Sequence, residues 1–177
     1  MRWKVVSERT VHSNPWLSLN LADVELPDGR HLDHYVLRQR AVAATAILNE
    51  QDEVLLLWRH RFITDSWGWE VPAGVVDEGE TPIQTAAREA EEETGWRVKN
   101  LRPLFDLEPA SGLGDCVHHV FVGDGAEYAG PPEDAHESES VKWVPLADVP
   151  TLITQGEIPA STTASALLYL HLEKYRA

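Results

Sequence analysis

This 177-residue chain contains a single cysteine, Cys116, and a single methionine. A lone cysteine excludes an intrachain disulfide, so the fold must be held by its apolar core and not by cross-links. The sequence has no apolar run long enough to span a membrane, and no segment with the composition of a secretory signal. We therefore expect a cytoplasmic protein that has no membrane partner.

Positive charge is also scarce, because 15 lysines and arginines face 29 aspartates and glutamates, which gives a net charge of −14. Without a basic stripe, the chain is a poor partner for nucleic acid. An acidic protein also repels a phosphate-bearing small molecule unless a metal cation lies between them. A phosphate substrate and a metal requirement therefore imply each other here.

Zinc is a weak candidate for that metal, although Cys116, His118 and His119 lie close together in the sequence. A structural zinc site needs four ligands at regular spacing, and the remaining ligands are missing.

The densest cluster of charged residues is the segment GVVDEGETPIQTAAREAEEETGW, which runs from Gly74 to Trp96. Its pattern predicts a helix over residues 81–94, with Thr81 as the N-cap, Pro82 in the first helical position and Gly95 after the last turn. The helical period predicts a buried stripe that consists of Ile83, Ala87, Ala90 and Thr94.

Three glutamates of this helix, Glu89, Glu92 and Glu93, are three and four residues apart and therefore share one face. Like charges at this spacing repel each other by a few tenths of a kcal/mol per pair. A hard divalent cation would remove the repulsion, because it binds several carboxylate oxygens at once. The alternative is an acidic helix face that is simply solvated.

Alternating and continuous apolar patterns predict strands on both sides of this helix. Strands are expected at 3–11, 16–26, 31–38, 41–48, 54–58, 97–107, 117–122 and 141–144, and helices at 146–155 and 162–175. Residues 123–140 are rich in Gly, Pro, Asp and Glu, which indicates a long mobile loop. Residues 1–40 are too few to bury a core alone, so they must pack on the rest of the chain or on a second copy. We therefore predict a β-strand dimerisation subdomain, 1–40, and a main domain, 41–177.

Two arginines, Arg59 and Arg61, follow the strand at 54–58 and are spaced so that both point to one side. Their planar guanidinium groups could hold phosphate oxygens, or they could form ion pairs with carboxylates of this acidic chain. Farther on, Trp67 and Trp69 would share a face of an extended segment. One of them is expected in the core, and Trp67 is our candidate for stacking on a nucleobase.

The helix segment resembles the Nudix box, because Gly74, Glu80, Arg88, Glu89, Glu92, Glu93 and Gly95 all match that pattern. Ala90 is smaller than the aliphatic residue usual at its place. The resemblance extends to the Glu70-Val-Pro-Ala-Gly segment, the Arg59/Arg61 pair and the N-terminal strands with Pro-Asp-Gly, all of which are similar to ADP-ribose pyrophosphatases.

This resemblance implies an α+β Nudix fold, in which a mixed β-sheet lies between helices and an N-terminal antiparallel extension builds a homodimer. It implies that Glu89 and Glu93 hold Mg²⁺, or alternatively Mn²⁺, with Glu92 and the backbone carbonyl of Ala73 alongside. Arg88 would orient these carboxylates, and Glu80 would support them. A glutamate of the long loop would act in catalysis, with Glu137 as the first candidate, Glu139 as the alternate and Glu133 as the third.

The function implied is hydrolysis of the pyrophosphate bond of a nucleoside diphosphate sugar, with ADP-ribose giving AMP and ribose 5-phosphate. Substrate contacts are expected from Arg59, Arg61, Trp67, Glu70 and Gly112. ADP-ribose enzymes typically have Pro-Gly about fifteen residues past the box, whereas this chain has Ser111-Gly112. Another nucleotide sugar or a dinucleotide is therefore an alternative substrate, and a nucleotide sensor without catalytic activity is a further alternative.

Overall fold

The computed structural model of the protein describes residues 1–133 and 137–175, and the chain divides into two compact units. The N-terminal unit comprises Met1–Ala41 together with Glu108–Val117. The main unit comprises Val42–Leu107 and His118–Ala177. The segment 108–117 thus groups with the N-terminal strands, although it lies far from them in the sequence.

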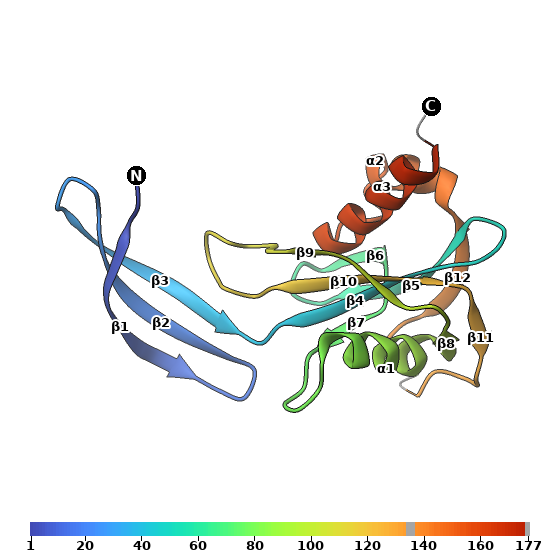
Figure 1. Cartoon of the computed structure of the whole chain (residues 1–177), viewed down its shortest axis with the longest axis horizontal. Helices are drawn as coiled ribbons and strands as arrows, with labels where there is room; N and C mark the ends of the chain where they lie inside the picture. Colours follow the sequence, from blue (N-terminus) through green and yellow to red (C-terminus); the bar gives the residue numbers. More distant parts are fainter. Residues whose placement is uncertain (134–136, 176–177) are drawn as a thin grey trace. The chain divides into compact units, whose positions relative to one another are not determined.

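The N-terminal unit is built on an antiparallel sheet in the order β1-β2-β3 (Figure 1), as the sequence predicts. The strands are β1 (Lys4–Ser13), β2 (Leu17–Glu25) and β3 (His31–Gln39). The turn between β2 and β3 is closed by backbone hydrogen bonds, in which the Leu26 and Gly29 N–H groups donate to Arg30 O and Leu26 O at 2.8 and 2.9 Å. Gly29 adopts a φ of +83°, which a glycine accepts without strain.

The Gly-rich segment of the same unit lies along β3. The Leu37 N–H donates to Leu113 O at 2.9 Å, and the Asp115 N–H donates to Leu37 O at 3.2 Å. Arg38 joins this segment to β1, because its guanidinium pairs with Asp115 at 3.1 Å and with Glu8 at 2.6 Å. The segment is therefore an attached edge of the N-terminal sheet and not a free loop.

The main unit is organised around a mixed sheet whose central strands run in the order β12-β5-β4-β10-β9. The β4–β10 pair is parallel and the other pairs are antiparallel, with β6 added beside β5 and β7 beside β4. The strands are β4 (Val42–Leu48), β5 (Glu53–Arg61), β6 (Ser66–Glu70), β7 (Ala73–Val75), β9 (Arg102–Leu107), β10 (His118–Asp124) and β12 (Ser140–Pro145).

Helices cover both faces of this sheet (Figure 1). They are α1 (Pro82–Thr94) on one face, and η1 (Leu146–Asp148), α2 (Val149–Thr154) and α3 (Ser161–Tyr175) on the other. Alternate residues of β4 pack against the helices on the two faces of the sheet. Ala43 packs with Ala86 of α1, and Ala44 lies in the cluster that includes Leu167 of α3. The expected α+β architecture of a mixed sheet between helices is confirmed.

In the described ranges, no helix combines the length and apolar character needed to cross a membrane.

Two expectations for the chain after α1 were wrong in detail. The predicted strand 97–107 is two strands, β8 (Trp96–Val98) and β9, because Asn100 turns the chain at a φ of +50°. Asparagine is one of the few residues that adopts this conformation readily. The predicted loop 123–140 contains the strand β11 (Ala126–Tyr128), which pairs with β8 in a separate two-stranded sheet.

Gly95 is expected to be the glycine at which the fold tolerates a side chain least. It ends α1 at a φ of +76°, and a Cβ there would lie 2.0 Å from the backbone oxygen of Gly130. We predict that Gly95→Ala lowers the free energy of unfolding by more than the roughly 1–2 kcal/mol typical of a left-handed alanine. Urea denaturation monitored by circular dichroism measures the difference.

Gly79 is the matched control, because its φ is +90° and a Cβ there would meet no atom within 4 Å. Gly79→Ala should cost only the conformational part of the penalty. Equal losses of stability for the two variants would show that the contact with Gly130 does not constrain the helix end.

Candidate functional site

The acidic segment folds into helix α1 with the ends that the sequence predicts. At the start, both the N–H and the hydroxyl of Thr81 donate to the side-chain oxygen of Gln84, at 2.9 and 2.7 Å. At the end, the N–H of Gly95 donates to Glu91 O at 2.7 Å in the left-handed conformation. The register of the carboxylates along the helix is therefore set by local sequence.

The buried face of α1 differs from the predicted stripe at its first two residues, since Ala87 as well as Ile83 is not buried. Ile83 is 39% exposed, whereas Ala86 is almost completely buried against β4 and β10. Thr85 and Glu93 are buried as well, so the face that packs on the sheet includes an ionisable residue. The prediction was wrong because periodicity alone does not show which side of a short helix the sheet covers.

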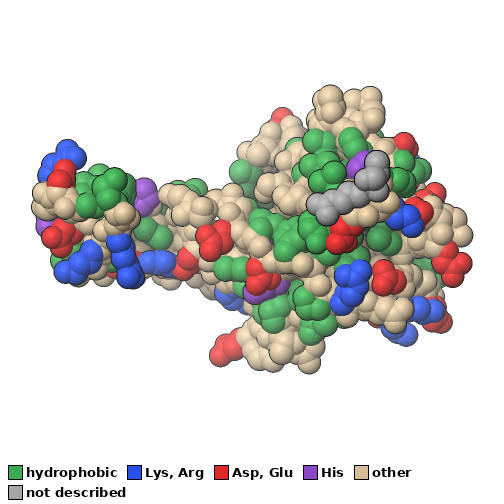
Figure 2. All heavy atoms as spheres, turned by 45° about the horizontal axis from the view of Figure 1, so that its top comes forward, with side chains coloured by type: hydrophobic (Ala, Val, Ile, Leu, Met, Phe, Trp, Pro, Cys, Tyr) green, Lys and Arg blue, Asp and Glu red, His purple; other side chains and the backbone are tan. Residues whose placement is uncertain are grey.

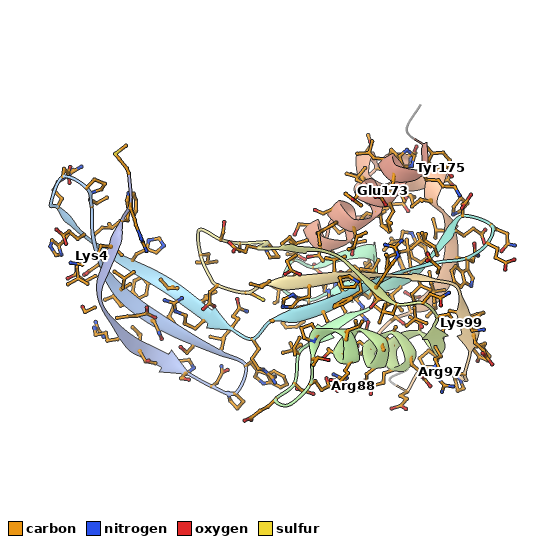
Figure 3. The ribbon with its side chains drawn as sticks, in the orientation of Figure 1. Lys4, Arg88, Arg97, Lys99, Glu173 and Tyr175 are labelled. Carbon is orange, nitrogen blue, oxygen red and sulfur yellow. The ribbon has the colours of Figure 1, made fainter. Side chains whose placement is uncertain are left out.

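Arg88 is the centre of the carboxylate cluster on α1. Its Nε and Nη2 donate to the two oxygens of Glu80 at 3.0 Å each. Its Nη1 donates to Glu89 at 2.9 Å and to Glu92 at 2.8 Å. One guanidinium thus gathers three carboxylates, which offsets their mutual repulsion. Arg88 is labelled on α1 in Figure 3.

Glu80 is fixed by two partners, since the Thr85 hydroxyl donates to its second oxygen at 2.7 Å beside Arg88. Hydrogen bonds from Arg88 and then from Thr85 lower the pKa of Glu80 to about 2. Glu80 therefore keeps its negative charge over the working range of pH. Thr85 was not among the site residues predicted from the sequence, although its position three residues before Arg88 on the helix was a usable signal.

Glu89 lies directly against Gly74 of β7. A Cβ on Gly74 would be 2.0 Å from the carboxyl carbon of Glu89, so only glycine leaves room for this carboxylate. Burial raises the pKa of Glu89, while the neighbouring Arg88 opposes the shift. Gly74, which begins the acidic segment, therefore helps to position Glu89.

Glu93 is the most deeply buried carboxylate of the cluster, with 4% of the residue exposed. Arg59 of β5 donates to one of its oxygens at 2.7 Å, and the N–H of Ala73 donates to the other at 2.9 Å. Desolvation raises the pKa of Glu93 to about 7, against the opposing effect of Arg59. Glu93 and Glu80 thus differ strongly in proton affinity although both belong to the same cluster.

Of the three loop glutamates, Glu137 is the one whose side chain reaches this cluster. Its carboxylate lies 3.6 Å from Nη2 of Arg59, and a side-chain hydrogen bond with it contributes to the raised pKa of Glu93. Glu133 and Glu139 instead connect the loop to other elements through their backbones. Their N–H groups donate to Glu92 O and Trp58 O at 2.9 and 2.8 Å. The expected mobile loop is therefore attached to α1 and β5 at these points.

Arg59 and Arg61 both carry partners in this structure. Arg59 is 5% exposed and engages Glu93, so its guanidinium is enclosed. Arg61 forms a two-pronged ion pair with Glu70 of β6, at 2.9 and 2.5 Å, and its side chain is about half exposed. Both arginines thus take the carboxylate partners that the sequence left open, and Arg61 is the more accessible one.

Trp67 is not brought together with the box carboxylates. It pairs with His60 across the β5–β6 ladder, while Trp58 pairs with Trp69. Because side chains alternate along a strand, these aromatic residues lie on the face opposite that of Arg59 and Arg61. The rings of Trp58 and Trp67 are stacked, with their centroids 6.2 Å apart.

Gly112 belongs to the N-terminal unit, where its carbonyl oxygen lies 3.2 Å from His34 Nε2. Cys116 belongs there too, and its thiol donates to Arg40 O at 3.2 Å. His118 and His119 are consecutive residues of β10, so their side chains point to opposite faces of the main sheet.

The donor set of the cluster fits a hard divalent cation. Glu89, Glu92 and Glu93 offer carboxylate oxygens, and the cradle at Gly74 keeps Glu89 against the strand that carries Ala73. Among residues 1–133 and 137–175, no three His, Cys, Asp or Glu side chains already converge as a metal site. In this structure, Arg88 donates to Glu89 and Glu92, and Arg59 donates to Glu93.

Comparison with known families agrees with this arrangement. The family model described as the NUDIX domain matches residues 37–164. A second family model, described as the nucleoside diphosphate sugar hydrolase N-terminal domain, matches residues 3–37.

Individual relatives cover nearly the whole chain. A CMP-5'-(N-acetyl-N-hydroxy-3-aminopropyl)phosphonate hydrolase of Streptomyces rubellomurinus is 42% identical over 95% of this chain and 82% of its own length. ADP-ribose pyrophosphatases of Mycobacterium tuberculosis and Bacillus subtilis are each 28% identical, covering 96% and 97% of this chain and 83% and 94% of their own lengths. A crystal structure titled as an ADP compounds hydrolase superposes with a TM-score of 0.84 at 21% identity, covering 100% of this chain and 98% of its own.

The raised pKa of Glu93 has a consequence for stability in the absence of metal. Between its ordinary value of 4.5 and its folded value of about 7, the folded state binds a proton that the unfolded state has lost. The unfolding free energy should therefore fall as pH rises through this window. We predict that Glu93→Gln removes this component, so the variant gains stability relative to wild type between pH 5 and pH 7.5, measured by urea denaturation in EDTA.

Glu91→Gln is the control, because Glu91 is on the same helix and its pKa is lowered by Arg97 instead of raised. This variant should show no such gain with pH. If the stability difference between Glu93→Gln and wild type is the same at both pH values, Glu93 does not hold the proton.

Proposed function

Because the chain belongs to the Nudix family, we propose that it is a hydrolase that cuts the diphosphate linkage of a nucleoside diphosphate sugar. The observation that carries this proposal is the cluster around Arg88, next to which Glu93 contacts both Ala73 and Glu137. A solvated acidic helix face would not bury Glu93 or place Glu89 against a glycine.

Nudix hydrolases generally use a divalent cation, and we assign Mg²⁺, or alternatively Mn²⁺, to this protein. The proposed ligands are Glu89, Glu92, Glu93 and the backbone carbonyl of Ala73. Their oxygen donors suit such an ion. When bound, the cation neutralises the diphosphate and lowers the pKa of the attacking water.

The remaining steps fall to side chains of this chain. Glu137 accepts a proton from the water as the water oxygen bonds to one phosphorus atom. The bond from that phosphorus to the bridging oxygen breaks, and the second phosphate leaves with the electron pair. Arg88 keeps the carboxylates in place, and we assign phosphate binding to Arg61, whose side chain is about half exposed. Glu139 and then Glu133 stay as the alternates for Glu137.

ADP-ribose is the first candidate substrate, and its products are AMP and ribose 5-phosphate. The ADP-ribose pyrophosphatases of the two bacteria support it. A second candidate is a CMP-linked phosphonate, because the relative named as a hydrolase of such a compound is 42% identical over 95% of the chain. Ser111-Gly112, in place of Pro-Gly, gives independent reason to test substrates other than ADP-ribose. Gly112, Trp67 and Glu70 stay proposed contributors to substrate binding.

We predict that the purified protein with Mg²⁺ hydrolyses at least one member of a panel of ADP-ribose, other nucleotide sugars, dinucleotides and CMP-linked phosphonates. Products are read by chromatography and by phosphate release after coupling to a phosphatase. Glu137→Gln should lower kcat about 10²- to 10⁴-fold, the usual contribution of a general base, with little change in KM.

Glu91→Gln, an exposed change on the same helix, is the control and should keep wild-type kinetics. If Glu139→Gln or Glu133→Gln loses more kcat than Glu137→Gln, the base is assigned to that residue instead. Binding of a panel member without turnover, in the presence of Mg²⁺, would favour the nucleotide sensor.

We also propose that the protein is a homodimer formed through the N-terminal strands, and that it is cytoplasmic. All ten residues of β1 are exposed within the chain, and large apolar side chains lie among them. Val5, Val6 and Val11 are examples, with exposed fractions of 56%, 47% and 46%. Figure 2 shows hydrophobic side chains on the visible face of this unit. A second copy would cover such a surface.

The double change Val5→Glu and Val11→Glu should convert the dimer to monomer, because it places charges in the proposed interface. Sedimentation equilibrium measures the mass, and circular dichroism checks that the strands persist. Ser7→Glu with Thr10→Glu adds the same charge to the same strand at polar positions and should disrupt the dimer less. A wild-type protein that is monomeric at micromolar concentration would contradict the proposal.

A further inference from the structure

Arg59 is an arginine enclosed beside the proposed metal site. It lies near the end of β5, is 5% exposed, and donates from Nη2 to Glu93 at 2.7 Å. Within the described part of the chain, its Nε is the one buried side-chain nitrogen or oxygen without a hydrogen-bond partner. Burying a guanidinium with an unpaired donor is unfavourable, so the surroundings of Arg59 are built for something more than packing.

Both oxygens of Glu93 accept a hydrogen bond in this arrangement. The N–H of Ala73 holds one oxygen, and Arg59 holds the other. Ala73 is fixed by the pairing of β7 with β4, in which it lies opposite Ala44. Arg59, in contrast, is a side chain with a second acceptor, because Glu137 Oε2 lies 3.6 Å from the same Nη2.

We propose that Arg59 is a positioning residue that occupies the cation's place beside Glu93 in the metal-free protein and transfers to Glu137 when a divalent cation binds. The inference rests on the proposed metal site. It assigns Arg59 a task other than holding phosphate: it favours the charged form of Glu93 and orients this carboxylate until the cation arrives. The transfer would then bring the Glu137 carboxylate under the control of the metal.

This exchange follows from the cost of leaving a buried carboxylate without a counter-charge. Before the cation binds, Arg59 supplies the positive charge that Glu93 needs. Afterwards the cation supplies it, and Arg59 needs a new acceptor, which Glu137 provides at the shortest movement. Arg59 should therefore matter more to the metal-free protein than to the metal-bound one.

The test compares the thermal midpoint of wild type and Arg59→Gln at pH 8.5, first in EDTA and then with saturating Mg²⁺. We expect the variant to be much less stable than wild type in EDTA. With Mg²⁺, the difference should fall to about half or less, because the cation replaces the missing charge. A difference that stays the same or grows with Mg²⁺ overturns the inference.

Arg61→Gln is the matched control, since Arg61 is on the same strand and its ion pair is with Glu70 instead of Glu93. Its loss of stability should be the same with and without Mg²⁺. Arg59→Lys keeps the charge and should behave more like wild type than Arg59→Gln in EDTA. If Arg59→Gln does not fold without metal, Arg59→Lys is compared with wild type instead, by titrating both proteins with Mn²⁺ and following metal binding by electron paramagnetic resonance.

A double-mutant cycle tests the transfer itself. The coupling between Arg59→Lys and Glu137→Gln should be larger with Mg²⁺ than in EDTA, because the two side chains pair fully only in the metal-bound state. A coupling that does not increase with Mg²⁺ excludes transfer to Glu137. If Mg²⁺ stabilises neither wild type nor any variant, the proposed metal site itself fails, which is a different outcome.

Discussion

Mutual repulsion among carboxylates is the constraint on which the rest of the site depends. Three of the glutamates around helix α1 are held by one guanidinium, that of Arg88, and the fourth, Glu93, is held by Arg59. Without these two guanidinium groups, the carboxylates of the acidic face would repel each other and would be poorly oriented. The two arginines come from different elements, so the helix, once folded, still depends on β5 to complete its charge balance.

Differences in burial give different pKa values to glutamates that look equivalent in the sequence. Glu80 is held by hydrogen bonds at the surface and has a pKa of about 2, whereas Glu93 is desolvated and has a pKa of about 7. Both retain contacts that fix their direction. A cation that binds this cluster therefore meets carboxylates that Arg88 and Arg59 have already gathered, and it must compete with these two guanidinium groups for their oxygens.

The parts of the fold that could be predicted are those that local sequence determines. Thr81, Pro82 and Gly95 mark both ends of α1, and the spacing of the glutamates follows from that helix. Tertiary contacts could not be predicted in the same way. The enclosure of Arg59, the position of Trp67 on the opposite face and the exposure of Ile83 all depend on which strand pairs with which. Asn100, in a left-handed conformation, also divides a continuous β-like pattern into the two strands β8 and β9.

The segment before β12 is tied by backbone hydrogen bonds at three places, from Ala129 to Gly95, from Glu133 to Glu92 and from Glu139 to Trp58. These bonds involve no side chain, so any residue type except proline can donate them at these three positions. They do depend on the number of residues between them, since the helix end and the strand are fixed points. Related chains can therefore vary the composition of this segment freely, whereas an insertion or deletion within it would move Glu137 relative to Glu93.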